Sequence, residues 1–83
     1  DVRRTSEWEL FHLKGATLIP LAQLAARAGE LDRDADWLVV CASGYRSSMA
    51  IGVLRRAGFK RLANLIGGMD AYQSMGLPVE VGT

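Results

Sequence analysis

Residues 37–58 read WLVVCASGYRSSMAIGVLRRAG, and this stretch decides the fold class. Trp37–Val40 is a continuous apolar run that includes two valines, which predicts a central parallel strand covered on both faces. From Ser47 to Ala57 the apolar residues recur at helical spacing, and Gly58 stands where a left-handed helix cap belongs. A buried strand that leads through a short loop into a helix is typical of an α/β fold.

The flanking segments continue the alternation of strands and helices. Further elements are predicted on both sides: strands at Ala16–Ile19 and Arg61–Leu65, and helices at Thr5–Phe11, Leu21–Ala28 and Met69–Met75. Ser6 and Glu9 have the spacing of a capping box at the start of the first helix. Because the connections are short, the sequence predicts an α/β fold with a small, mostly parallel sheet flanked by helices.

The length and charge of the chain limit what it can be. Its 83 residues fit one compact domain over residues 1–83. Ten Lys and Arg residues against nine Asp and Glu residues give a net charge of +1, without the basic excess of a nucleic-acid-binding face. The longest apolar run, Trp37–Ala42, is far shorter than the roughly 20 residues of a membrane helix. We therefore expect neither a nucleic acid nor a membrane as a partner.

The chain has one cysteine, Cys41, and one histidine, His12. These counts exclude an internal disulfide and a Cys/His metal site, and a reducing, cytoplasmic location is the default expectation. His12 follows a short predicted helix. We expect it to be a fold element that bonds the backbone rather than a general base.

The segment Cys41–Ser47 lies between the predicted strand and helix, at the edge where open α/β sheets bind ligands. A loop that curls into a helix N-terminus points backbone N–H groups inward, and Gly44 permits a positive φ there. A cysteine at the base of this anion cradle, close to Arg46, should have a pKa below about 8.5 and be nucleophilic at neutral pH. Alternatively, Cys41 is one more buried apolar residue after the strand.

The segment Cys41–Arg46 resembles the active-site loop of the rhodanese family of single-domain sulfurtransferases, which reads Cys-x-x-Gly-x-Arg or close to it. Other segments are similar to family motifs in the same order: Asp1-Val2-Arg3, His12–Ala16, Ile19–Leu21, Ala57–Phe59, Asn64–Gly68 and Gly76–Val79. The resemblance implies the family's three-layer α/β fold. The first strand and helix of the family precede the Asp-x-Arg motif, so we expect residues 1–83 to be an N-terminally incomplete domain of a longer or partner-stabilised protein.

The resemblance also implies a two-step sulfur transfer without a cofactor. The thiolate of Cys41 takes a sulfane sulfur from thiosulfate or a persulfide and passes it to a thiophilic acceptor. Arg46 is expected to bind the donor's oxyanion, while Asp1 and Arg3 orient the loop by charge-assisted hydrogen bonds. The expected donor-binding residues are those of the loop: Ala42, Ser43, Gly44, Tyr45 and Ser47.

Three other functions compete with this one. Cysteine phosphatases place their arginine one residue further from the cysteine than Arg46 stands from Cys41, which disfavours a phosphatase. A rhodanese-like interaction module without turnover is disfavoured because Cys41 is present. A sulfur-delivering domain of a larger fusion, for instance with a metallo-β-lactamase-like domain that oxidises persulfides, stays open. Ala42 stands where the family often has arginine, so the donor also stays open.

Overall fold

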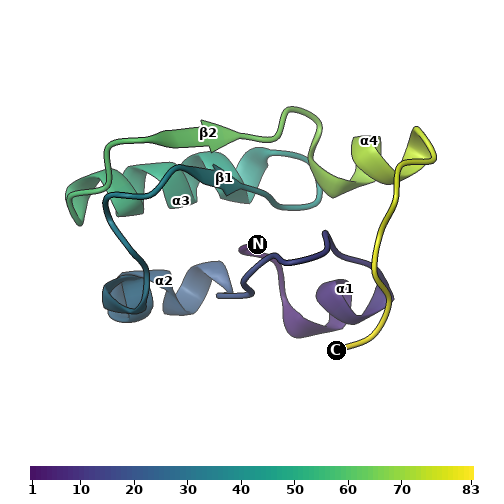
Figure 1. The fold of residues 1–83 in the computed structure, drawn as a ribbon, viewed down its shortest axis with the longest axis horizontal. Helices are drawn as coiled ribbons and strands as arrows, with labels where there is room; N and C mark the ends of the chain where they lie inside the picture. Colours follow the sequence, from purple (N-terminus) through teal and green to yellow (C-terminus); the bar gives the residue numbers. More distant parts are fainter.

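A computed structural model describes residues 1–83 of the chain (Figure 1). The elements follow one another in the order α1 (Thr5–Leu10), α2 (Leu21–Arg27), the 3₁₀ helix η1 (Ala28–Glu30), β1 (Trp37–Val39), α3 (Tyr45–Arg56), β2 (Leu62–Asn64) and α4 (Gly68–Ser74). Helices and strands alternate along the second half, which confirms the predicted α/β class.

The sheet consists of two short parallel strands joined through α3. Trp37 lies opposite Leu62, and Val39 lies opposite Asn64. The helix α3 packs against both strands and against α2, and Figure 1 shows it running along β1 and β2. Because the strands are parallel, their carboxyl ends meet at one edge, where the residues after β1 and the last residue of β2 become neighbours.

The backbone of Asp1 and Val2 forms hydrogen bonds with two other segments, one around Val40 and one around Ile19. The N–H of Val2 donates to the carbonyl of Val40 at 2.9 Å, and the N–H of Ile19 donates to the carbonyl of Asp1 at 3.0 Å. The strand predicted at Ala16–Ile19 is therefore wrong. Within this segment only Thr17 and Ile19 bond to the N-terminal residues, both through Asp1, and these isolated bonds do not form the repeated pairs of a ladder.

The helices α1 and α2 begin at Thr5 and Leu21 as predicted, but the capping of α1 and the start of α3 differ from the prediction. At α1 the carboxylate of Glu7, rather than that of Glu9, accepts from the backbone N–H of Arg4 at 3.0 Å. The observed capping box therefore begins at Arg4, two residues before the predicted one at Ser6. The helix α3 begins at Tyr45, two residues earlier than predicted, because Gly44 turns the chain directly into it.

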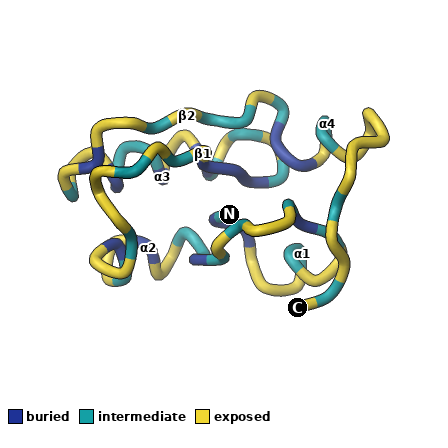
Figure 2. The backbone as a smooth tube through the Cα atoms, in the orientation of Figure 1, coloured by how far each residue is buried: buried dark blue, intermediate teal, exposed yellow.

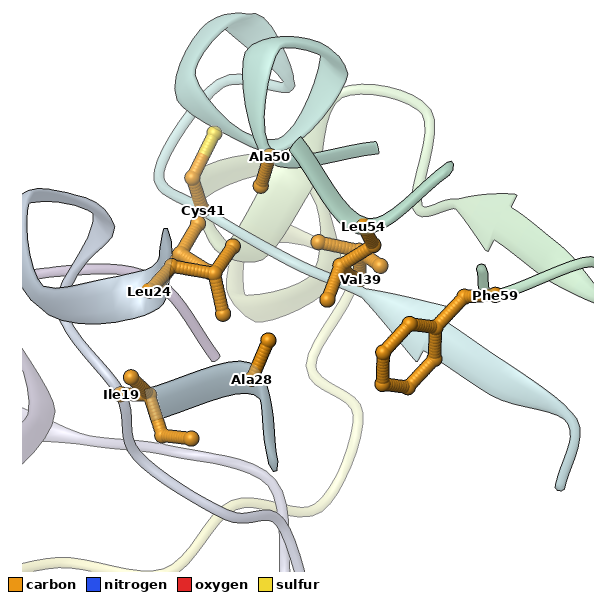
Figure 3. Close-up of a cluster of buried hydrophobic side chains, with 9 residues drawn as sticks. Ile19, Leu24, Ala28, Val39, Cys41, Ala50, Leu54 and Phe59 are labelled. Carbon is orange, nitrogen blue, oxygen red and sulfur yellow. The ribbon is translucent and has the colours of Figure 1, made fainter. Parts of the chain in front are cut away.

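The core lies between the sheet and the helices α2 and α3. Nine buried apolar residues form one cluster: Val2, Ile19, Leu24, Ala28, Val39, Cys41, Ala50, Leu54 and Phe59 (Figure 3). Figure 2 shows buried backbone at the end of β1 and at the start of α4. The core thus reaches from α2 to the carboxyl edge of the sheet, and the cysteine is part of it. No helix of the fold has the length and apolar character needed to cross a membrane.

Candidate active site

Cys41 lies two residues after the end of β1 and is the first residue of the predicted loop. It has 0% of its surface exposed. The backbone N–H of Gly44 donates to its Sγ at 3.0 Å, and Sγ lies 3.4 Å from the hydroxyl oxygen of Ser47. Figure 3 shows the sulfur pointing toward the first turn of α3. The segment between strand and helix therefore curls around the sulfur.

Gly44 gives this loop its shape. Its φ of 99° lies in the left-handed region, which glycine adopts without the steric cost that a side chain imposes. In this conformation its N–H faces the sulfur while the chain turns into α3 at Tyr45. The amide and the helix N-terminus thus meet at the same atom.

Asn64 joins the loop from the neighbouring strand. The hydroxyl of Ser47 donates to Asn64 Oδ1 at 2.6 Å, and Asn64 Nδ2 donates to the carbonyl of Gly44 at 3.3 Å. Cys41, Gly44, Asn64 and Ser47 therefore form a closed ring of hydrogen bonds, called here the Cys41 ring. Asn64 is absent from the site predicted from the sequence. The signal for it was available, because β2 was predicted beside β1 and its carboxyl end shares an edge with Cys41.

The surroundings of Cys41 set the direction of its pKa. Burial of the thiol raises the pKa, but hydrogen bonds from the Ser47 side chain and from the backbone N–H groups of Ser47, Gly44 and Ser43 outweigh it. The pKa of Cys41 is therefore below its ordinary value. This is the direction that the sequence predicted from an amide-lined loop.

Arg46 points to α1 and forms a bidentate ion pair there. Its Nη1 donates to Glu7 Oε1 at 2.7 Å, and its Nη2 donates to Glu7 Oε2 at 2.8 Å. The hydrogen bonds from Arg46 hold the pKa of Glu7 down at about 2. Arg46 makes no hydrogen bond to Cys41, and the charge on Cys41 is only a minor cause of the raised pKa of Arg46. Sequence reasoning missed Glu7 as the partner of this arginine.

Asp1 and Arg3 form a second ion pair, which is almost completely buried. Arg3 Nη2 donates to Asp1 Oδ2 at 2.8 Å, and its Nε donates to both carboxylate oxygens. The same guanidinium donates to the backbone carbonyls of Glu7 and Phe11, at 3.4 Å and 2.7 Å. None of these bonds reaches the loop. The pair fixes α1 instead, and α1 carries the carboxylate that holds Arg46.

The start of the loop is also attached to α4 through its backbone. The carbonyls of Cys41 and Ala42 accept from the N–H groups of Met69 and Asp70 at 2.8 Å and 2.9 Å. Gly68 allows this approach, because a Cβ at that position would collide with the Ala42 carbonyl. The remaining loop side chains, those of Ser43 and Tyr45, belong to exposed residues.

His12 lies outside this arrangement. Its ring stacks on Trp8 with a centroid separation of 3.6 Å, and its Nδ1 lies 2.8 Å from the carbonyl of Trp8. The prediction that His12 is a fold element bonded to the backbone is confirmed. No group of three or more His, Cys, Asp and Glu side chains in the fold could hold a metal ion.

An apolar cavity of about 250 Å³ lies away from Cys41. It is bounded by the first residues of the chain, the segment around Gly15 and the strand β1, and none of its lining comes from residues 41–47. A second hollow includes one residue of the loop, Arg46, and is otherwise lined by Val2, Arg4, Pro20, Leu21 and Ala22.

Comparison with known proteins identifies the family. The model of the rhodanese-like domain matches residues 1–75. The chain is 39% identical to the Bacillus subtilis protein named "Putative sulfur carrier protein YrkF" over 69 residues, which is 83% of this chain and 37% of that protein. It is 33% identical to a protein named "Sulfurtransferase" from Allochromatium vinosum over 79 residues, which is 95% of this chain and 74% of that protein.

A solved structure agrees with the sequence relatives. The rhodanese-related protein from Thermoplasma volcanium superimposes with a TM-score of 0.90 at 29% identity, over 96% of this chain and 79% of that one. Several relatives are much longer proteins, of which this chain matches 37% of the length or less. A family model that covers most of the chain, relatives named for sulfur transfer and a matching fold lead to one conclusion: the chain belongs to the family of rhodanese-like domains.

Proposed function

We propose that this domain is a sulfurtransferase that carries sulfane sulfur as a persulfide on Cys41. The observation that carries the proposal is the position of Cys41 Sγ, 3.0 Å from the backbone N–H of Gly44 at the entrance to α3. The lowered pKa of Cys41 increases the fraction of thiolate at a given pH, and the thiolate is the nucleophilic form. The names of relatives as sulfurtransferase and sulfur carrier support the same reaction class.

The reaction runs in two displacements that balance without a redox partner. The Cys41 thiolate attacks the outer sulfur of thiosulfate or of a persulfide, forming an S–S bond while sulfite or the donor thiolate leaves. A nucleophilic acceptor then attacks the outer sulfur of the Cys41 persulfide, and the Cys41 thiolate leaves in turn. The sulfur moves at an unchanged oxidation state, so the loop has only to bind anions.

The loop backbone is suited to the anions of both steps. The N–H groups of Ser43, Gly44 and Ser47 lie at the sulfur, where charge develops in both steps. The residues expected to contact the donor are Ala42, Ser43, Gly44, Tyr45 and Ser47, as the family resemblance implies. Glu7 accepts from two of the five N–H donors of Arg46 and neutralises its charge, so Arg46 would bind an anionic donor more strongly after giving up part of this ion pair. Asp1 and Arg3 serve this site indirectly, through the position of α1.

Access to Cys41 requires a movement. Because the residue has no exposed surface, a donor sulfur reaches Sγ only when part of the segment 42–46 turns aside. Ser43 and Tyr45 are exposed and lie in this segment, so they can move at little cost in burial.

A second function follows from the lengths of the relatives. The chain matches only 37% of the length of YrkF, so the matching part of YrkF is one part of a longer protein. If this chain is likewise part of a longer or assembled protein, its Cys41 persulfide would deliver sulfur to the fused or partner domain. The chemistry at the loop is identical, and only the acceptor differs.

The test is intact-mass measurement of the purified chain after incubation with thiosulfate or with glutathione persulfide. We expect a gain of one sulfur atom that cyanide removes as thiocyanate, and no gain in Cys41→Ser, which should fold normally. A folded protein that neither donor loads would refute the proposal and favour a non-catalytic interaction module.

A further inference from the structure

We propose that Asn64 is a positioning residue that competes with Cys41 for the single hydroxyl proton of Ser47. The inference deepens the proposed function and rests on it for its catalytic meaning. The inference is based on the geometry of the Cys41 ring. The hydroxyl of Ser47 has a single proton but lies next to two possible acceptors, Asn64 Oδ1 and the sulfur of Cys41.

Ser47 is the member in question. It is completely buried, so no solvent can replace a missing partner of its hydroxyl. A serine hydroxyl has one proton to donate and can accept through its lone pairs. At 2.6 Å from Asn64 Oδ1, this oxygen donates to the amide, and at 3.4 Å it accepts from the thiol of Cys41. All the groups are satisfied when Cys41 is a thiol.

Ionisation of Cys41 breaks this balance. The thiolate has no proton to give, and the hydroxyl of Ser47 would have to turn to the sulfur to stabilise it. Two oxygen atoms, Ser47 Oγ and Asn64 Oδ1, would then face each other at 2.6 Å with no proton between them. Asn64 therefore competes with the thiolate for the proton, so the hydrogen bond from Ser47 to the sulfur is weaker than it would be without Asn64, and the backbone donors of the loop carry more of the charge.

Asn64 cannot escape by turning its amide over. In the present orientation its Nδ2 donates to the carbonyl of Gly44 at 3.3 Å. A flipped amide would place Oδ1 against that carbonyl, two acceptors in contact. The hydrogen bond to Gly44 thus fixes which end of the amide Ser47 meets.

This competition makes the sulfur a better nucleophile. A thiolate with fewer hydrogen bonds has a higher pKa and a higher intrinsic reactivity, since nucleophilicity rises with basicity with a slope of about 0.4–0.5. In the persulfide the inner sulfur has neither proton nor full charge, so the hydroxyl of Ser47 stays with Asn64. The hydrogen bonds of the ring are therefore all satisfied when Cys41 is a thiol or a persulfide. They stabilise the attacking thiolate least.

Charged groups near Cys41 do not take part in the ring. Those that face it from the surrounding elements are Arg3 of the N-terminal segment, Arg46 of α3, their partners Asp1 and Glu7, and Asp70 of α4. A substitution of Asn64 by another neutral residue leaves all of them in place. A change in the titration of Cys41 in such a variant then reports the ring alone.

The experiment measures the rate of Cys41 alkylation by iodoacetamide from pH 5 to pH 10 in four forms of the full chain: unchanged, Asn64→Ala, Ser47→Ala and the double variant. We expect Asn64→Ala to lower the midpoint by about one pH unit, because Ser47 is freed for the thiolate, and to lower the plateau rate about threefold, as the reactivity slope requires. Gly44 keeps its place in this variant, since its carbonyl also accepts from the N–H and the hydroxyl of Ser48.

Ser47→Ala should raise the midpoint, and the double variant should match it, because Asn64 acts through Ser47. A raised midpoint in Asn64→Ala, or the same shift with and without Ser47, would overturn the proposal. Asn64→Asp serves as a second variant, checked for folding by circular dichroism like the others. It keeps an acceptor for Ser47 and adds a negative charge, so a lowered midpoint there would also contradict the competition.

Alkylation needs no sulfur donor, which separates this inference from the proposed function. If the unchanged chain fails to gain sulfur from thiosulfate and from glutathione persulfide, the proposed function fails while the alkylation result still decides the role of Asn64. If the chain gains sulfur but the midpoint does not fall in Asn64→Ala, only the further inference fails.

Discussion

On one side of Cys41 the contacts are neutral. On the other side lie two ion pairs, of which Glu7–Arg46 joins the loop to α1 and Asp1–Arg3 holds α1 in place. The Cys41 ring uses an amide, a hydroxyl and a carboxamide, all within hydrogen-bond distance of the sulfur or of one another. The pairs Asp1–Arg3 and Glu7–Arg46 are charged, and neither forms a hydrogen bond with the sulfur. Under the proposed function this difference corresponds to a division of work, in which the ring would set the reactivity of the thiol and the ion pairs would hold the scaffold and receive anions.

The largest effect is expected from the buried ion pair, because its loss leaves a charge without a partner. Arg3→Gln would strand the carboxylate of Asp1 in a position with no exposed side-chain surface. We expect the free energy of unfolding, measured in urea, to fall by about 3–5 kcal/mol. The double variant Asp1→Asn/Arg3→Gln should lose less than the sum of the two single variants. If the loss of unfolding free energy in the double variant equals the sum of the losses in the two single variants, the two residues do not act as a pair.

A smaller effect, on donor choice, is expected from the second ion pair. Glu7→Gln keeps an oxygen to accept from Arg4 at the helix cap but removes the charge that holds Arg46. Arg46 then becomes available to a dianion, and we expect loading by thiosulfate to rise about threefold to tenfold relative to loading by glutathione persulfide.

Glu9→Gln is the matched control for this change. It removes the same charge from the same helix, but Glu9 is exposed and does not contact Arg46. An equal rise in both variants would mean that net charge, rather than the release of Arg46, controls the donor.

The smallest effect is a dependence of stability on pH. The pKa of Glu7 is about 2 in the fold against an ordinary value of 4.5. Because the folded value is the lower one, the stabilisation is complete above 4.5 and is lost as the pH falls toward 2. The difference in unfolding free energy between the unchanged chain and Glu7→Gln should shrink through this window. A difference that stays constant down to pH 2 would show that the ion pair does not stabilise the fold.

The sequence predicted the strand, loop and helix around Cys41 well, because local patterns determine them. The apolar run before Cys41 and the helical spacing after it required no knowledge of distant residues. The prediction failed at Ala16–Ile19, where strand formation depends on pairing with residues distant in the sequence, and the segment makes only isolated bonds to Asp1. It also missed Glu7 and Asn64, whose roles depend on pairs separated by 39 and 17 residues. Only the rule that parallel strands share one edge could have suggested Asn64.

The attachment of the loop to α4 has a consequence for how the domain matures. Cys41 and Ala42 depend on the N–H groups of Met69 and Asp70, which leave the ribosome long after the cysteine itself. During synthesis the loop therefore lacks part of its support until most of the chain has been made. The thiol acquires its final environment late, so a partly synthesised chain would carry an ordinary cysteine rather than an activated one.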